Sequence, residues 1–167
     1  MSIFKDLNDY EILKTKLNKE NIYTLNDRDD SLLHIAIDKG CELRIIKLLI
    51  EKGSDINYNN TYSGYSALHL AVEYENEELV KLLLSYEETE TELITMNYET
   101  ALHIACKYNN YNIVKLLVES GSEINQYNDK GILPIGLTNS KKITKYLLEK
   151  GSYINKTELT LKEYLEI

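Results

Sequence analysis

Apolar residues recur in this chain as two kinds of short string that alternate along the sequence. The first kind reads SLLHIA at 31–36, SALHLA at 66–71 and TALHIA at 100–105. The second kind follows about ten residues later and reads IIKLL at 45–49, LVKLL at 79–83 and IVKLL at 113–117. In each string the apolar positions fall on one face at helical spacing. The pattern therefore predicts paired antiparallel helices, over 31–39 with 43–52, 66–74 with 77–86, and 100–108 with 111–120.

Polar residues and glycines mark the ends of these helices. Ser31, Ser66 and Thr100 precede the first helices, where a hydroxyl accepts a hydrogen bond from a free backbone N–H group. Gly53 and Gly121 lie just past the second helices, at a position that favours left-handed backbone. A turn then follows, which reads GSDIN at 53–57, GSEIN at 121–125 and GSYIN at 151–155. One such unit cannot bury its apolar face alone, so the repeats predict a stack with a continuous core.

The period of the pattern carries a family resemblance. His34, His69 and His103 are separated by 35 and 34 residues. The strings around them resemble the T-P-L-H-x-A signature and the closing G-A-D-I-N turn of ankyrin repeats, over about residues 25–155. This resemblance implies an all-α fold, an ankyrin-repeat solenoid of stacked helix-turn-helix units with hairpin-like connecting turns.

The repeats divide the chain, which we expect to form a single domain over 1–167. The fourth copy is degenerate, because it keeps Pro134, has Gly136 where histidine belongs, and is about three residues short between its helices. The second copy lacks the closing glycine and aligns Glu87 there. We predict an N-terminal cap half-repeat at 1–24, repeat 1 at 25–58, repeat 2 at 59–93, repeat 3 at 94–126, degenerate repeat 4 at 127–155 and a C-terminal cap helix at 156–167.

Composition narrows the class of protein. The 167 residues are 43% hydrophobic and 28% charged, as in a globular domain. A net charge of −8 without a run of Lys or Arg argues against nucleic acid and anionic membranes as partners. Two cysteines and no apolar signal core favour a reducing compartment, the cytoplasm or nucleus. AT-rich ankyrin chains like this one resemble those of large DNA viruses, intracellular parasites and some microbial eukaryotes. For the first two sources, the expected compartment is that of a host cell. We expect a monomer.

The sequence offers little catalytic chemistry. Equivalent positions in a stack lie on the order of 8–10 Å apart, whereas zinc ligands each lie about 2.0–2.1 Å from one ion. We therefore interpret the three histidines as hydrogen-bonding backbone or the neighbouring Ser or Thr, pinning one repeat to the next. The Gly-Ser turns follow helix C-termini, the wrong polarity for a phosphate loop. Neither Cys41 nor Cys106 has a histidine at a matching place. We expect no metal, no cofactor and no enzymatic activity.

The family resemblance implies a recognition face made from the turn tips and the exposed side of each first helix, the concave face of the stack. Tyrosine is prominent in this chain, with 14 Tyr against one Phe and no Trp. Tyr74 and Tyr108 are 34 residues apart, so they should form a stripe suited to an interface. The positions carried over are Arg28, Asp30, Asp38 and Lys39; Asn60, Tyr62, Tyr65, Glu73 and Tyr74; Met96, Asn97, Glu99, Lys107 and Tyr108; and Tyr127, Asp129, Lys130 and Ile132.

Two features of the sequence leave alternatives open, including whether the concave face or the acidic segment of repeat 2 is the main contact. The tyrosines can also reflect an AT-rich genome, in which tyrosine is simply common. A cluster of acidic residues in repeat 2 is either a solvated surface or a region that steers a basic partner. Its members are Glu73, Glu75, Glu77, Glu78, Glu87, Glu88, Glu90 and Glu92.

The resulting hypothesis is a protein-protein interaction module, an adaptor or inhibitor that binds a partner protein through the concave face. The alternatives are a structural or substrate-recruiting module of a larger ubiquitin-ligase or signalling assembly, and part of an enzyme. A transcription-factor inhibitor of the inhibitory-κB sort is an option that fold analogy alone suggests.

Overall fold

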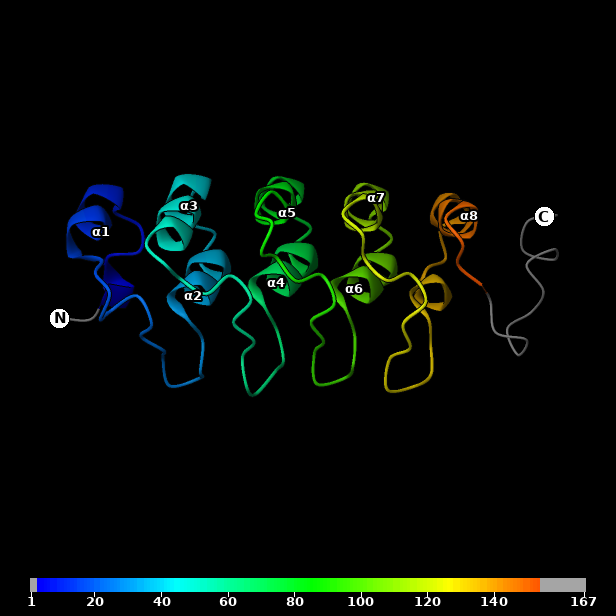
Figure 1. The fold of residues 1–167 in the computed structure, drawn as a ribbon, viewed down its shortest axis with the longest axis horizontal. Helices are drawn as coiled ribbons and strands as arrows, with labels where there is room; N and C mark the ends of the chain where they lie inside the picture. Colours follow the sequence, from blue (N-terminus) through cyan, green and yellow to red (C-terminus); the bar gives the residue numbers. More distant parts are fainter. Residues whose placement is uncertain (1–2, 154–167) are drawn as a thin grey trace.

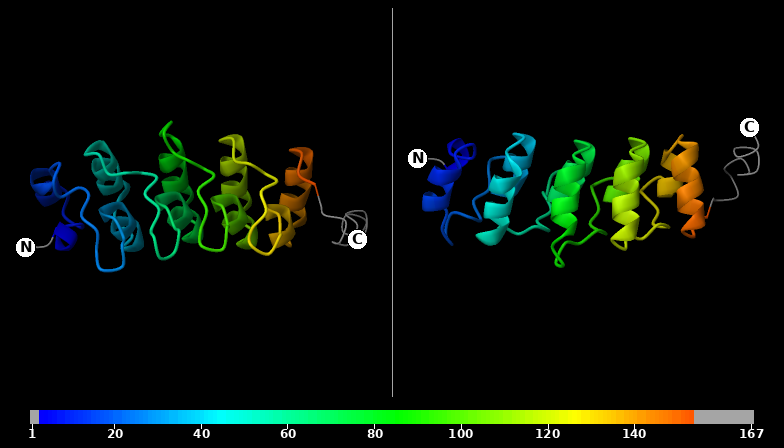
Figure 2. Two further views of the ribbon diagram at one scale, coloured as in Figure 1. Left: turned by 60° about the horizontal axis from the view of Figure 1, so that its bottom comes forward. Right: turned by 90° about the horizontal axis from the view of Figure 1, so that it is seen from above.

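A row of helix pairs forms the body of the molecule (Figure 1). The computed structural model describes residues 3–153. First helices line one layer and second helices the other, side by side along the stack (Figure 2). All six predicted helices are present within two residues at each end, which confirms the all-α fold. The first helices are α2 (Leu32–Asp38), α4 (Ala67–Glu73) and α6 (Ala101–Lys107), and the second helices are α3 (Leu43–Glu51), α5 (Glu77–Leu84) and α7 (Tyr111–Glu119).

Both ends of the stack carry shorter elements. A 3-10 turn, η1 (Ile3–Lys5), and α1 (Tyr10–Lys16) precede repeat 1, and α1 packs on α3. Repeat 4 consists of η2 (Pro134–Leu137) and α8 (Lys141–Glu149). The first helix of this degenerate copy is reduced to η2, a 3-10 turn that begins with proline and contains a glycine. The C-terminal cap helix predicted at 156–167 lies outside the described residues, and the repeat boundaries stay a prediction.

The core runs through all the repeats as one cluster of buried side chains. Ala36, Ala71 and Ala105 are fully buried in the layer of first helices, which pack directly on one another. Larger side chains fill the space between layers, and each contributes roughly 1.5–3 kcal/mol on burial. Examples at successive repeats are Leu49, Leu83, Leu117 and Leu147. Each repeat therefore gains most of its stability from its neighbours.

Three equivalent histidines link successive repeats. Nε2 of His34 lies 2.9 Å from the carbonyl oxygen of Tyr65, and Nε2 of His69 and His103 lie 3.2 Å from those of Glu99 and Ile132. A carbonyl only accepts, so Nε2 must carry the proton and donate. Nδ1 is then the acceptor, 2.8–2.9 Å from the hydroxyl that precedes each helix. The prediction that these rings pin one repeat to the next is confirmed.

The turns between helix pairs form protruding fingers, which we define as residues 26–31, 60–66, 95–100 and 128–133 (Figure 1). Each is closed by a backbone hydrogen bond across its base, for example from the N–H of Asn60 to the carbonyl of Tyr65 at 2.9 Å. Neighbouring fingers also touch, because the N–H of Met96 donates to the carbonyl of Ser63 at 3.0 Å. One position in each finger has left-handed backbone, and its occupants are Asp29, Gly64, Tyr98 and Gly131.

Repeat 2 ends its second helix differently from its neighbours. In repeats 1 and 3 a glycine with positive φ follows the helix, and the next backbone N–H bonds back to Leu49 or Leu117 at 2.9 and 3.1 Å. Helix α5 stops earlier, at Leu84, and the hydroxyl of Thr89 donates to the carbonyl of Leu83 at 2.6 Å instead. A side-chain hydroxyl thus bonds the carbonyl that the backbone N–H after the glycine bonds in repeats 1 and 3. The predicted end at 86 is two residues too late.

Burial of His34, His69 and His103 predicts that the stability of the fold depends on pH. Burial lowers the pKa of His69 to about 4 from an ordinary value of 6.5, and it also lowers the pKa of His34 and His103. The unfolded chain therefore binds protons more readily, so this contribution is complete above pH 6.5 and is lost as the pH falls towards about 4. We expect the Tm, followed by circular dichroism, to fall across that window. The fall in Tm should be shallower for His69→Gln, in which the carboxylates still titrate but this histidine is absent. Identical dependence of Tm on pH in the variant and the wild type would contradict a contribution from His69.

Two finger glycines with the same backbone conformation provide a matched test of finger packing. Gly64 and Gly131 both have a φ of +69°, but a Cβ at Gly64 would lie 2.7 Å from backbone atoms of Thr95 and Met96, whereas a Cβ at Gly131 meets nothing within 4 Å. We expect Gly131→Ala to lower the free energy of unfolding by about 1 kcal/mol and Gly64→Ala by roughly 2 kcal/mol or more. Urea unfolding measures both, and equal losses would show that the second and third fingers are not in close contact.

Repeat 4 should be the least protected part of the described stack. Its first helix is reduced to η2, and Gly136 leaves it without the histidine bond that repeats 1 to 3 have. A weaker terminal unit opens before the centre in a nearest-neighbour stack. We expect amide hydrogen exchange, read by mass spectrometry, to be faster in residues 131–153 than in residues 66–118. Equal protection of the two segments would be the contrary result.

Candidate functional site

The candidate site is the surface predicted from the sequence as the concave face. It is formed by the fingers and by the sides of α2, α4, α6 and η2 that face away from the second helices, and we call it the inner face. The structure places the sequence-predicted residues on it with different exposure. Tyr65, Glu73 and Glu99 are half-buried. The exposed ones are Arg28, Asp38, Tyr62, Tyr74, Met96, Asn97, Lys107, Tyr108, Tyr127, Asp129 and Lys130.

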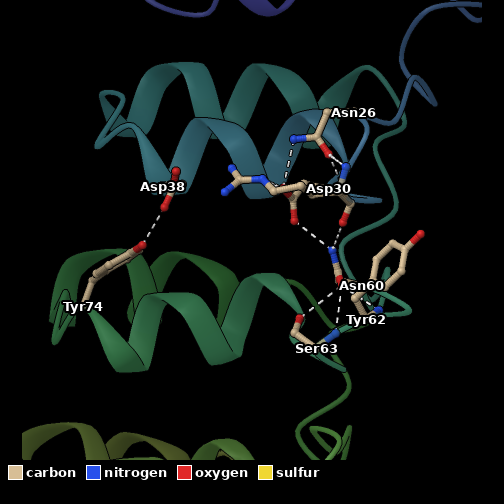
Figure 3. Close-up of polar contacts among 8 residues, drawn as sticks. Asn26, Asp30, Asp38, Asn60, Tyr62, Ser63 and Tyr74 are labelled. Carbon is tan, nitrogen blue, oxygen red and sulfur yellow. Dashed lines mark hydrogen bonds and ion pairs between the residues drawn. The ribbon is translucent and has the colours of Figure 1, made fainter.

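Asn60 corrects one prediction, because it is buried, with 4% of its surface exposed. Its amide nitrogen donates to the carbonyl of Arg28 and to Oδ1 of Asp30, both at 2.8 Å. Its amide oxygen accepts the backbone N–H groups of Tyr62 and Ser63 at 2.9 and 3.0 Å (Figure 3). Every polar atom of the side chain is used to hold finger 2 and tie it to finger 1. Asn60 is therefore a structural residue beneath the inner face.

Tyr74 lies across the junction between repeats 1 and 2. Half of its surface is exposed, and its hydroxyl donates to Oδ1 of Asp38 at 2.7 Å (Figure 3). This hydrogen bond is the main cause that raises the pKa of the Tyr74 phenol to about 12. The ring therefore stays neutral and is held by the preceding repeat, while part of its surface remains accessible. Such a held aromatic ring loses little conformational entropy when another molecule packs on it.

Tyr108 and Tyr65 lie near the next junction, around Glu73. The hydroxyl of Tyr65 donates to Oε1 of Glu73 at 3.4 Å, and the Tyr65 ring packs on His69 with centroids 5.7 Å apart. Tyr108 is 42% exposed, and burial followed by the charge of Glu73 raises the pKa of its phenol. Tyr74 and Tyr108 thus occupy equivalent, accessible places at the ends of α4 and α6. Tyr65 is mainly a packing residue.

Two hollows adjoin the junction between repeats 1 and 2. The first has a volume of about 260 Å³, with Ile35 and Leu70 as its apolar lining. Its polar lining includes Arg28, Asp30, Asp38 and Tyr62. The second has a volume of about 200 Å³ and is lined by Ile37, Asp38, Gly40, Tyr74, Asn76 and Leu79. Asp38 lines both.

Tyr98 is a residue of this face that the sequence-based prediction missed. It is 57% exposed and occupies the left-handed position of finger 3, with a φ of +58°. Gly64 and Gly131 hold the equivalent positions, so their spacing could have identified a tip residue there. A non-glycine residue with left-handed backbone costs on the order of 1–3 kcal/mol. Together with exposed Met96, it makes finger 3 the most apolar of the tips.

The acidic segment of repeat 2 lies apart from the inner face, in the turn after α5. Glu87, Glu88 and Glu90 are exposed. The turn is held from repeat 1, since Nδ2 of Asn57 donates to the carbonyl of Glu88 at 2.6 Å and the N–H of Glu90 donates to Oδ1 of Asn57 at 2.9 Å. Of the acidic cluster, Glu73 and Glu75 lie near Tyr108, where burial and then their charges raise the pKa of its phenol.

The buried histidine and cysteine side chains favour their neutral forms. Burial lowers the pKa of the histidines and raises the pKa of the thiols of Cys41 and Cys106. Both changes disfavour the charged forms that a thiolate nucleophile or an imidazolium would need. Within residues 3–153 no group of three or more His, Cys, Asp or Glu side chains is placed to hold a metal ion. In the same part of the chain, no helix is long and apolar enough to cross a membrane.

Comparison with known proteins agrees with this architecture. A family model described as ankyrin repeats (3 copies) matches residues 2–93 and 87–158. The chain therefore belongs to the ankyrin-repeat family, whose members bind other proteins. The ankyrin repeat domain of Bcl-3, described as a member of the IkappaB protein family, has a similar structure, with a TM-score of 0.68 and 28% sequence identity, over 75% of this chain and 55% of that one.

Similar sequences occur in proteins with varied descriptions. The I-Kappa-B like protein G2 of Microplitis demolitor bracovirus (isolate Webb) is 37% identical over 83 residues, which are 47% of this chain and 49% of that protein. Transient receptor potential cation channel subfamily A member 1 of Homo sapiens is 29% identical over 135 residues, 79% of this chain but 12% of the channel. The alignments span half or less of these relatives, so the likeness concerns the repeats.

Proposed function

We propose that the protein is an adaptor or inhibitor that binds a partner protein through the inner face, with Tyr74 and Tyr108 near the centre of the contact. The observation that carries the proposal is the pair of equivalent, half-accessible tyrosines, of which Tyr74 is hydrogen-bonded to the preceding repeat. Aromatic side chains at the centre of an interface contribute most of the binding free energy. Compositional abundance alone does not account for their placement at equivalent helix ends.

An inhibitor of the IkappaB type is the more specific form of this proposal. Two comparisons favour it: a viral protein with that description, and the Bcl-3 repeat domain. We propose a non-enzymatic monomer that acts in the cytoplasm or nucleus, of a host cell if the gene is viral. The rival is a structural or substrate-recruiting module of a ubiquitin-ligase or signalling assembly, which would use the same face. Identifying the captured partner separates the two.

The first binding prediction compares two pairs of substitutions. We expect Tyr74→Ala with Tyr108→Ala to weaken partner binding by roughly 2 kcal/mol or more, because central aromatic anchors are lost. Glu88→Lys with Glu90→Lys, in the acidic turn, should change mainly the association rate. The measurement is equilibrium and kinetic binding to the partner identified by affinity capture with the wild-type chain.

Two controls make this comparison interpretable. Tyr23→Ala removes an exposed tyrosine outside the inner face and should bind like the wild type. Circular dichroism should show all variants folded. If the glutamate pair abolishes binding while the tyrosine pair binds normally, the partner contacts the acidic turn of repeat 2, and the inner face is not the binding surface.

A further inference from the structure

The junction between repeats 1 and 2 differs from a plain hydrophobic groove because a carboxylate stands where its two hollows meet. Asp38 lines both the 260 Å³ hollow on the finger side and the 200 Å³ hollow beside Tyr74. Its side chain points to Tyr74, and Asp30 and Asn60 lie towards the fingers (Figure 3). An extended peptide segment that lies across this junction would therefore pass Asp38. It could place one side chain in each hollow, or direct one side chain at the carboxylate of Asp38.

Apolar side chains line the hollows on both sides of Asp38. Ile35 and Leu70 contribute to the first, and Ile37 and Leu79 to the second. The first hollow is also lined by Arg28 and Asp30, which pair with each other, so Asp38 is its carboxylate without an ion pair among the described residues. Apolar walls beside such a carboxylate suit a side chain with a long aliphatic stem and a cationic end. Lysine and arginine are the residues with that construction, and their charged groups make strong hydrogen bonds to a carboxylate.

The charge of Asp38 is not neutralised within the described chain. Oδ1 accepts a hydrogen bond from the Tyr74 hydroxyl, a neutral donor. Among residues 3–153, the ion pairs with a nitrogen–oxygen distance up to 4.0 Å do not include Asp38. Of the nearby cations, Arg28 pairs with Asp30 at 3.5 Å, and Nζ of Lys39 donates to the carbonyl of Phe4 at 2.9 Å.

Asp30 shows by contrast what a satisfied carboxylate in this junction looks like. Oδ2 accepts from Nδ2 of Asn26 at 2.9 Å and pairs with Arg28, and Oδ1 accepts from Asn60 at 2.8 Å. Both of its oxygens are therefore used to hold the fingers together. Within residues 3–153, the Tyr74 hydroxyl is the one donor to Asp38, and it bonds Oδ1, which orients the carboxylate and leaves Oδ2 available for a ligand. The overall charge of −8 adds long-range attraction for a cation.

We propose that the partner presents an extended, basic segment whose lysine or arginine side chain binds Asp38 at the junction of repeats 1 and 2. The proposal rests on the proposed function, since it names the chemistry of the partner on the inner face. The aliphatic stem packs against Ile35 and Leu70, and the cationic group donates to Oδ2 of Asp38. The Tyr74 ring flanks this contact.

The test selects ligands and then removes the charge. A phage-displayed library of random 12-residue peptides is selected on the full-length chain, and an enriched peptide is synthesised as the probe. We expect enriched peptides to share a Lys or Arg. Asp38→Asn, which keeps the shape of the side chain and an acceptor for Tyr74, should weaken probe binding by roughly tenfold or more. Asp55→Asn, which makes the same charge change in the exposed turn after α3, outside the inner face, and keeps the acceptor for the N–H of Asn57, should alter it by less than about twofold.

A double-mutant cycle assigns the effect to one pair of groups. The probe with its Lys or Arg replaced by methionine should lose affinity by a similar factor and become insensitive to Asp38→Asn. Tyr74→Phe removes the hydroxyl donor but leaves the carboxylate charge, so preference for the cationic probe should persist. Fluorescence anisotropy of the labelled probe measures each dissociation constant.

The outcomes separate this proposal from the one on which it rests. Binding that is weakened by Tyr108→Ala but unchanged by Asp38→Asn would overturn the cation contact and leave the inner face as the binding surface. Binding that is unaffected by either substitution would overturn both. A selection that enriches no peptide, or enriches peptides without Lys or Arg, also counts against a basic segment.

Discussion

The hydrogen bond from a buried imidazole to the backbone of the next repeat is the contact on which the geometry of the stack depends. His34, His69 and His103 each place a proton on Nε2 and direct it at a finger carbonyl of the following repeat. The same ring accepts from the residue that caps its own helix, so one side chain fixes a helix start and a finger at once. Because the ring is neutral and buried, the bond is not screened by salt as a surface ion pair would be.

The side chains of the inner face are held in place by contacts between successive repeats. The fingers are held below the surface by side chains such as Asn60, which donates back to repeat 1. At the other end of α4, the hydroxyl of Tyr74 also donates back to repeat 1, to Asp38. A residue that contacts a partner here is therefore also part of a contact between repeats. This explains how an exposed tyrosine is presented in one orientation, and why separating recognition from stability needs substitutions such as Asp38→Asn that keep shape.

The repeat pattern predicted what depends on period and local chemistry. Helix pairs, the hydroxyl caps at Ser31 and Ser66 and the positive φ of Gly53 all follow from residues close together in sequence. The errors arose where a side chain bonds to atoms of another segment. Asn60 was placed on the surface because position alone does not reveal its bonds to finger 1, and the hydroxyl of Thr89 bonds a carbonyl six residues away. The hollows at Asp38 require two repeats to be placed together.

The histidine bond also has a direction, with a consequence for how such a chain can be lengthened or shortened. Repeats 2 and 3 each carry both halves of the linkage, a donor imidazole and an acceptor carbonyl. Repeat 1 contributes the donor His34, and repeat 4 contributes the carbonyl of Ile132, with Gly136 in the place of a donor. In the terms of polymer chemistry, the two central units are bifunctional monomers and repeat 4 is an end group. Extra copies of the central units could be inserted between the ends, whereas a unit joined after repeat 4 would meet no matching group.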